Sequence, residues 1–342
     1  MSTATEALTR RQAGPAIGTI GWTLRKPSFW VVIGLLIIVG LLPLVTGNNT
    51  LRESMFTVLM FAGLAASLNI LMGYTGYVNF GNIVFFGLGG YVGFYVMSAL
   101  GWNLFPALLV GGLAAGSLAA LLGLALLRLR GAYFALATIG VNEAARAFVA
   151  NFEPFGAATG MHINFGVYNQ YGGAASALQL SYILMLILAI VVACVSFFVK
   201  DSRLGHGLFS IREDEDAATV MGVNPWRYKT IAYVLSAIFP GIIGVIFFFK
   251  NGNIEPLDAF PFQRSLEVLV MVMLGGNGTV LGPMLGAGIY QEMRGFLLTN
   301  DLFKNLQLAF AGLALLLIVL FVPAGLVGWI RGRFPVTRRW LE

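Results

Sequence analysis

The sequence predicts an all-α integral membrane protein with about eight transmembrane helices and one Gly-rich hairpin. Hydrophobic residues make up 58% of the 342 residues and charged residues only 11%, whereas an average soluble domain is about one quarter charged. A helix needs about 20 largely apolar residues to cross a bilayer, because hydrocarbon offers no hydrogen-bond partner to the backbone. Eight stretches meet that requirement: 29–47, 55–72, 78–97, 105–127, 132–150, 178–199, 230–250 and 303–322.

A ninth apolar stretch, residues 264–292, differs from the others. Its centre reads GGNGTVLGP, and adjacent glycines followed by a proline interrupt a regular helix. We therefore expect two short helical pieces around a turn. This hairpin, re-entrant or built from a broken helix, would enter and leave on one side of the membrane.

Lysine and arginine indicate the orientation, because they are retained on the cytoplasmic side. They cluster before the first span, after the fourth, between the sixth and seventh, and at the chain's end, while residues 151–177 contain none. Both termini are therefore expected in the cytoplasm. The expected organisation is an N-terminal arm at 1–28, a transmembrane domain at 29–330 and a basic tail at 331–342.

Several classes of function find no support in the sequence. The net charge of +6 follows from membrane orientation and does not indicate nucleic-acid binding. The phosphate-binding pattern G-x-x-x-x-G-K-[ST] is absent, as is a nucleophile with a matching base. His162 and His206 are isolated, so no metal site is expected. We expect no catalytic residues and no cofactor bound by this chain.

The segment 200–229, on the predicted cytoplasmic side, carries ten of the chain's 36 charged residues. Ser210 stands three residues before Glu213, the spacing of a helix capping box, and acidic residues up to Asp216 follow in the first turns. Small alanines, Ala217 and Ala218, then form an apolar side, and Gly222 supplies a stop. The pattern predicts a helix of about 11 residues, roughly 16 Å long, that docks into a groove of another protein.

Charged residues inside the predicted spans are candidates for the translocation pathway. Glu143 and Arg146 lie three apart on one helical face and are expected to pair. Such a pair either meets the charged groups of a substrate or locks its helix to a neighbour. Glu267, near the mouth of the hairpin, is a further candidate.

Polar residues of the second and third spans and of the hairpin turn complete the set of pathway candidates. Interhelical hydrogen bonds explain most such residues, but a zwitterion also needs neutral donors and acceptors along its path. The candidates are Asn69, Asn79, Asn82, Gly275, Gly276 and Asn277.

Three ordered signatures resemble one family of membrane proteins. DAATVMG, Asp216 to Gly222, is similar to the E-A-A-x-x-x-G loop of ABC importer permeases, with Asp216 where the family usually has Glu. Leu127 to Arg146 and Ser265 to Ala287 resemble two further signatures of the branched-chain amino acid importer permeases of the LivM/LivH type. The resemblance covers about residues 55 to 325 and favours the M-type subunit.

The resemblance implies a transport subunit and not an enzyme. Its implied partners are a second homologous permease subunit, two cytoplasmic ATP-binding subunits that hold ATP and Mg, an external substrate-binding protein and membrane lipid. The implied location is the bacterial inner membrane. The implied binding surface for the external protein is segment 151–177, with Glu153, together with 251–263, with Glu255 and Asp258.

Two alternatives remain open at the level of sequence. Asn82 stands where the family often has His, and ATGMHINF, Ala158 to Phe165, departs from the usual Gly-rich outer turn, so the exact substrate stays open. Because related permeases share the same signatures, the same importer class could carry urea or short amides. The second alternative is an ion-coupled secondary transporter, which would be expected to hold more intramembrane carboxylates and no docking helix.

Overall fold

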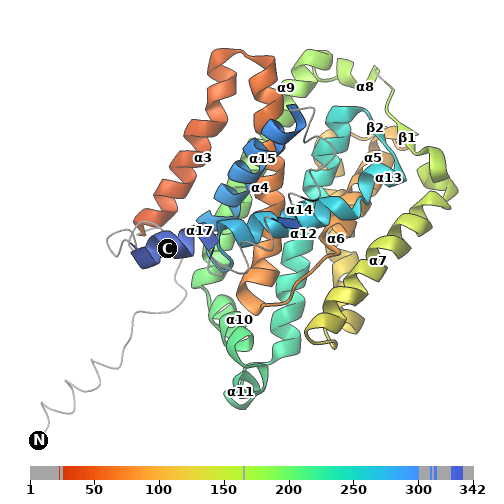
Figure 1. Cartoon of the computed structure of the whole chain (residues 1–342). Coiled ribbons are helices and arrows are strands. Elements are labelled where there is room, and N and C mark those ends of the chain that lie inside the picture. The colour runs from red at the N-terminus through yellow and green to blue at the C-terminus, as the bar shows by residue number, and fades with distance from the viewer. Residues whose placement is uncertain are drawn as a thin grey trace, which may run out of the picture.

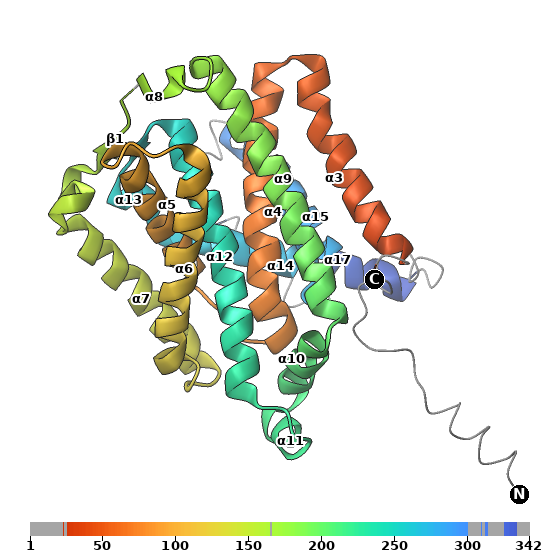
Figure 2. The same cartoon turned by 180° about the vertical axis from the view of Figure 1, so that it is seen from behind.

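Long helices lying side by side make up most of the molecule (Figure 1, Figure 2). The computed structural model describes residues 23, 26–164, 166–299, 309, 312–313 and 325–333. The longer helices of that part are α3 (Pro27–Thr46), α4 (Asn49–Thr75), α5 (Asn82–Ser98), α6 (Leu104–Leu126), α7 (Ala132–Ala150), α9 (Ala174–Asp201), α12 (Pro225–Asn251) and α15 (Leu281–Thr299).

Several short elements lie at the two ends of the bundle. One end holds α10 (Arg203–Glu213) and α11 (Glu215–Val220), and we call it the α11 end (Figure 1). At the opposite end, β1 (Met161–His162) pairs antiparallel with β2 (Asn253–Ile254). The remaining short elements are η1 (Glu153–Phe155), η2 (Ala157–Thr159), α8 (Gly166–Asn169), α13 (Pro256–Ala259), α14 (Phe262–Gly275) and α17 (Gly325–Arg333).

The helices confirm an all-α membrane protein. Five of them, α3, α4, α6, α9 and α12, are long and apolar enough to cross a membrane, and α5 is a shorter apolar helix. Helix α7 coincides with the predicted stretch 132–150. Helix α5 begins at Asn82, later than the predicted 78, and Gly76 in the connection before it adopts a positive φ of 78°. The predicted span 303–322, the arm and the tail lie almost wholly outside the described residues.

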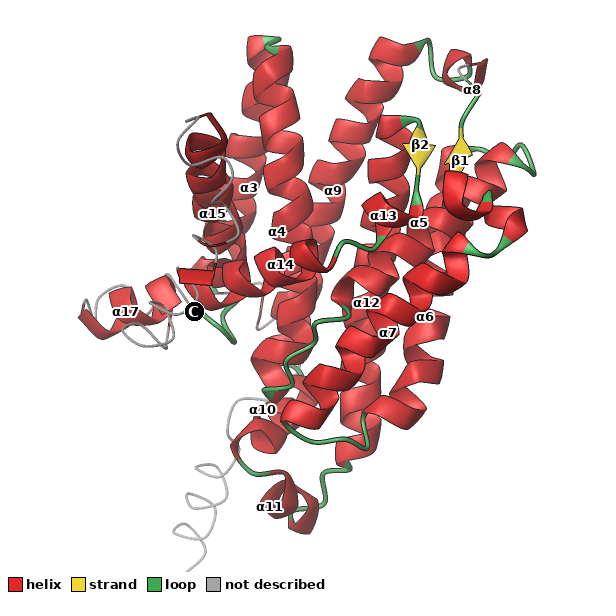
Figure 3. Ribbon diagram, turned by 45° about the vertical axis from the view of Figure 1, so that its right-hand side comes forward, coloured by secondary structure: helices red, strands yellow, loops and turns green. Residues whose placement is uncertain are grey.

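The chain between 262 and 299 forms two helices around a turn, as its glycines predict. Helix α14 ends at Gly275, where Gly276 has a φ of 129°, and α15 begins at Leu281. Helix α14 runs across the long helices, whereas α15 stands beside α4 (Figure 3). The two pieces therefore have different directions.

Glycines let α5, α6 and α12 pack with their backbones close together. A Cβ at Gly89 of α5 would overlap Gly241 of α12, and a Cβ at Gly111 of α6 would lie 2.7 Å from the carbonyl oxygen of Gly89. At Gly244 of α12 a Cβ would overlap the carbonyl oxygen of Phe86. Small residues at helix interfaces allow this approach in membranes, where packing and not the hydrophobic effect holds helices together.

Replacing Gly244 with alanine tests this packing. We expect Gly244→Ala to destabilise the protein by about 1–3 kcal/mol, because the added methyl forces backbone atoms apart. Gly34→Ala is the matched control, since a Cβ at Gly34 of α3 meets nothing within 4 Å, and it should be neutral or stabilising by up to ~1 kcal/mol. Thermal unfolding in detergent, followed by tryptophan fluorescence, measures both. Equal effects of the two substitutions would contradict the packing argument.

Candidate functional site

The prediction that a helix starts at Ser210 is wrong. Ser210 lies inside α10, where its hydroxyl donates to the carbonyl oxygen of His206 at 3.0 Å, and Glu213 is the last residue of that helix. A second helix, α11, begins at Glu215. Asp214 caps it, because its carboxylate accepts from the backbone N–H groups of Asp216 and Ala217 at 2.9 and 3.0 Å. The capping role therefore belongs to Asp214.

A buried ion pair fastens α11 to the membrane helices. Lys229, near the start of α12, is only 2% exposed, and its Nζ donates to Glu215 Oε1 at 2.8 Å. Nζ also contacts the hydroxyl of Tyr77 at 3.0 Å, and that hydroxyl donates to Glu215 Oε2 at 2.9 Å. The carbonyl oxygen of Leu127 accepts a further bond from Nζ at 3.3 Å. We call Glu215, Lys229 and Tyr77 the Glu215 latch.

The latch joins segments that are distant in sequence. Tyr77 lies between α4 and α5, Leu127 follows α6, and Lys229 belongs to α12. Burial raises the pKa of Glu215, but hydrogen bonds from Lys229 and Tyr77 outweigh it and leave this pKa below its ordinary value. Burial and the bond to Glu215 raise the pKa of Tyr77, which therefore stays a neutral hydrogen-bond donor. The carboxylate is thus charged at neutral pH.

The rest of α11 presents small and apolar side chains to solvent. Ala217 is exposed, whereas Ala218 is 4% exposed and packs inward. Val220 and Met221 are 87% and 84% exposed, respectively. The predicted stop is present, since the chain turns at Gly222 with a φ of 88°. Asp216 is also exposed and pairs with Arg130 at 3.1 Å.

A second contact links α10 to the turn between α14 and α15. Arg212 Nη1 donates to the carbonyl oxygen of Gly73, in the last turn of α4, at 2.7 Å. A Cβ at Gly278 would lie 3.0 Å from the same Nη1. Asn69 of α4 holds the turn from the other side, because it donates to the carbonyl oxygen of Thr279 at 2.8 Å and accepts from Gly278 N at 2.9 Å. Arg212 and Asn69 thus bracket this turn.

The predicted hairpin residues serve the geometry of the same turn. A Cβ at Gly275 would overlap the carbonyl oxygen of Gly282, so the two helix ends approach closely. Gly276 takes the positive φ, and its carbonyl oxygen accepts the Thr279 hydroxyl at 2.8 Å. Asn277 Oδ1 is buried and has no hydrogen-bond partner among the described residues.

Two asparagines predicted for the pathway lie buried at the start of α5. Asn79 is fully buried and its Oδ1 accepts from Gly81 N at 2.9 Å. Its Nδ2, like Oδ1 of Asn82, has no partner in the described part of the chain. Buried amide groups without partners are uncommon, so this connection holds unused hydrogen-bonding capacity.

The predicted charged candidates occupy two different places. Glu143 and Arg146 pair at 2.6 Å on α7, with side chains 51% and 42% exposed. Glu267 of α14 is 5% exposed, accepts from Gln263 at 3.4 Å and lies 3.7 Å from Arg294 of α15. The structure therefore does not bring the predicted candidates into one site.

An open cavity of about 520 Å³, lined by both polar and apolar groups, adjoins the latch. It lies between the α4–α5 connection, the start of α7 and α10. Its polar lining comes from Thr75, Tyr77, Arg130, Arg212 and Glu215.

Sequence reasoning missed the residues that fasten α11. In the sequence, Lys229 contributes only to the orientation signal, although a lysine at the start of an apolar helix, 14 positions after Glu215, is compatible with an ion pair. For Arg212 no local pattern exists, because its partner Gly73 is 139 residues away.

Substituting Glu215 tests the latch. Glu215→Gln leaves a buried ammonium without an anion, so we expect a loss of about 3 kcal/mol in stability. Asp216→Asn, which breaks an exposed pair on the same helix, should cost less than about 1 kcal/mol. Thermal unfolding in detergent at pH 7 compares the two variants.

The stability difference between the wild type and Glu215→Gln should also depend on pH. The folded-state pKa of Glu215 lies below its ordinary value of 4.5, so its contribution is complete above that value and is lost as pH falls through the lowered pKa. The gap between the wild type and Glu215→Gln should stay constant from about pH 8 to 5.5 and shrink only in more acidic solution. A gap that closes between pH 8 and 6 would contradict the assignment.

Comparison with known proteins finds one family and several relatives that are similar to this chain. The family described as "Branched-chain amino acid transport system / permease component" matches residues 49–320. The LivM permease protein of the high-affinity branched-chain amino acid transport system of Escherichia coli is 28% identical over 96% of this chain and 79% of its own length. The LivH permease protein of the same organism is 22% identical over 78% of this chain and 91% of its length.

A third relative matches about half of the chain. The BraD permease protein of Pseudomonas aeruginosa is 26% identical over 48% of this chain and 52% of its own length. No solved structure matches the chain significantly. Because the family match extends over most of the sequence, this chain belongs to the permease-component family of branched-chain amino acid transport systems.

Proposed function

We propose that the chain is the transmembrane permease subunit of an ATP-driven, binding-protein-dependent importer for branched-chain or related amino acids. The observation that carries the proposal is α11, which is anchored to the helix bundle by the Glu215 latch yet exposes Val220 and Met221. Exposed apolar side chains on a firmly held helix favour contact with another protein. The family membership supports the same class.

The α11 end faces the cytoplasm in this proposal. Arg128 and Arg130 follow α6, and Arg203, Arg212 and Arg227 lie on or beside α10 and α11. Such clustering is the mark of the cytoplasmic side. Both termini are then cytoplasmic, with eight crossings and a re-entrant hairpin at 264–292. Helix α14 supports the hairpin, because its 14 residues span about 21 Å, less than the ~30 Å hydrocarbon core.

Partner subunits complete the importer. Two ATP-binding subunits hold ATP and Mg, one of them docks on α11, and a second homologous permease subunit lies beside this one. The external binding protein docks at the opposite end, where the β1–β2 pair joins segment 151–177 to segment 251–263. Glu153, Glu255 and Asp258 supply negative charge there.

The second permease subunit covers the exposed face of α7. An ion pair facing lipid would be costly, and Glu143 with Arg146 is half exposed on this chain. Contact with a protein surface or with the aqueous pathway between the subunits removes that cost. In either case the Glu143–Arg146 pair lies at the boundary between the two permease subunits.

Two sets of contacts transmit a movement of α11 to the membrane helices. The Glu215 latch connects α11 to α12, which packs closely against α5 and α6. Arg212 connects α10 to the end of α4 and to the turn at Gly278. A displacement of α11 by the ATP-binding subunits would therefore shift α12 and the α14–α15 turn together.

The docking role is tested on the exposed edge of α11. Val220→Asp and Met221→Asp add charge without disturbing the latch, so both should fold and insert but lose copurification of the ATP-binding subunit. Leu257→Asp is the control, because Leu257 is 68% exposed on α13 at the opposite end. Affinity purification from membranes measures the retained subunit. Full retention by both α11 variants would refute the docking assignment.

Arg212 is tested by comparing transport with ATP hydrolysis. In the assembled importer in proteoliposomes, Arg212→Gln should leave ATP hydrolysis largely intact while lowering amino acid uptake by about 10-fold, the effect of losing one charge-assisted hydrogen bond. Arg203→Gln, at the exposed start of α10, is the matched control. An unchanged ratio of uptake to hydrolysis in Arg212→Gln would exclude a coupling role.

A further inference from the structure

A charged cavity lies on the α14–α15 side of the bundle, away from the α11 end. Its volume is about 310 Å³, and α4, α12, α14 and α15 form its walls. Polar groups come from Gln263, Arg264, Glu267 and Arg294, and an apolar wall comes from Met60 and Phe247. Charged and apolar groups therefore face each other across one space.

The cavity has more positive than negative charge. Its described lining contains two guanidinium groups and one carboxylate. The guanidinium of Arg264 is fixed, because it lies 5.1 and 5.3 Å from the ring centroids of Phe86 and Phe247 and donates to the carbonyl oxygen of Asp258 at 3.0 Å. An excess cation in a partly buried space favours an anionic ligand group.

Glu267 and Arg294 form an open pair. Their closest atoms, Glu267 Oε2 and Arg294 Nη1, are 3.7 Å apart, longer than a charge-assisted hydrogen bond of about 2.8 Å. Arg294 Nε is buried and has no hydrogen-bond partner in the described part of the chain. The carboxylate is 5% exposed, so its charge is poorly solvated. Both groups therefore retain the capacity to bind a ligand.

We propose that this cavity is a binding site for a zwitterionic amino acid with an apolar side chain. Arg294 binds the carboxylate, Glu267 binds the ammonium group, and Met60 with Phe247 contacts the side chain. The site rests on the proposed function, since it names where the imported amino acid binds. The proposed site includes Glu267, which the sequence predicts as a pathway candidate, together with Arg264 and Arg294, which the sequence does not.

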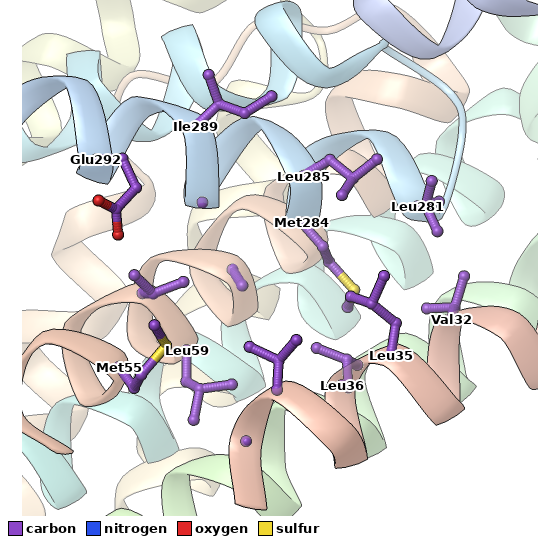
Figure 4. A pocket seen from close by; sticks show the side chains of 15 residues that line it. Val32, Leu35, Leu36, Met55, Leu59, Leu281, Met284, Leu285, Ile289 and Glu292 are labelled. Atoms are coloured by element: carbon purple, nitrogen blue, oxygen red, sulfur yellow. The ribbon is translucent and has the colours of Figure 1, made fainter. Parts of the chain in front are cut away.

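A second, larger cavity lacks the chemistry for a zwitterion. It measures about 430 Å³ and lies between α3, α4 and α15 (Figure 4). Its described lining is apolar except for Glu292 at one end and includes no positive group (Figure 4). An amino acid carboxylate would be buried there without a partner.

The charged cavity shares its helices with the contacts that Asn69 and Arg212 make at the α14–α15 turn. Two walls come from α4 and α12, and two come from α14 and α15, whose turn is bracketed by Asn69 and Arg212. Thr57 in the cavity and Gly73 beside Arg212 are separated by about 24 Å along α4, at 1.5 Å per residue. Movement of the turn would thus change the distance between the cavity walls.

Equilibrium binding of radiolabelled L-leucine tests the site. The assembled importer, purified in nanodiscs without the external binding protein, is compared as wild type, Glu267→Gln and Arg294→Gln. Each variant should bind leucine at least ~10-fold more weakly. The control is Glu292→Gln, two residues from Arg294 on α15 but facing the apolar cavity, and it should bind within about 2-fold of wild type. Leucine binding equal to wild type in both cavity variants would overturn the site.

Competition by two analogues separates binding from a structural role. Leucinamide lacks the carboxylate, and 4-methylpentanoate lacks the ammonium group. On the wild-type importer, leucinamide should compete weakly against leucine, whereas on Arg294→Gln it should bind about as well as leucine does. In the same way, 4-methylpentanoate should bind more weakly than leucine to the wild type but about as well as leucine to Glu267→Gln. Equal weakening of leucine and both analogues would show that the residues only support the fold. Should a neutral variant not assemble, Glu267→Asp and Arg294→Lys take its place, with the same analogue pattern expected.

Failure of the site and failure of the proposed function are distinguishable. ATP-dependent leucine uptake by the wild-type importer with its binding protein tests the function. Uptake without saturable leucine binding by the complex would overturn the site alone, and absence of uptake would overturn the function on which the site rests.

Discussion

The buried ammonium group of Lys229 is the constraint that fixes α11 to the membrane helices. It is 2% exposed and its anionic partner is Glu215 of α11, 2.8 Å away. Separating α11 from α12 would leave this charge buried without a partner, which is more costly than moving the two helices together. Since α12 also packs on α5 and α6 through glycines, a force on a six-residue helix can act on much of the bundle.

Arg212 adds a second attachment with a different target. It reaches the last turn of α4 and the glycine turn between α14 and α15. The turn can approach so closely because Gly275 and Gly278 lack side chains, and Asn69 supplies the hydrogen bonds that fix it. The charged cavity is built partly from the helices that this turn joins. In the proposed importer, force applied at the α11 end thus has a physical route to the proposed amino acid site.

The sequence predicts the long helices well and the site only in part. Apolar runs locate α3, α4, α6, α9 and α12, because the bilayer demands about 20 apolar residues whatever the tertiary contacts. The predicted cap at Ser210 is wrong because a serine inside a helix can donate to the carbonyl oxygen four residues back, as Ser210 does to His206. Lys229 and Arg294 escape prediction because their partners lie on other helices, and pairing across a fold leaves no local pattern.

The most direct test of the account asks what α11 touches in the assembled importer. A photoreactive group on Met221→Cys, in a Cys194→Ser background that removes the single native thiol, should capture the ATP-binding subunit. The same group on Leu257→Cys, at the opposite end of the bundle, should capture the external binding protein. Capture of the external binding protein from Met221 and of the ATP-binding subunit from Leu257 would contradict the central claim that α11 receives the force generated by ATP hydrolysis.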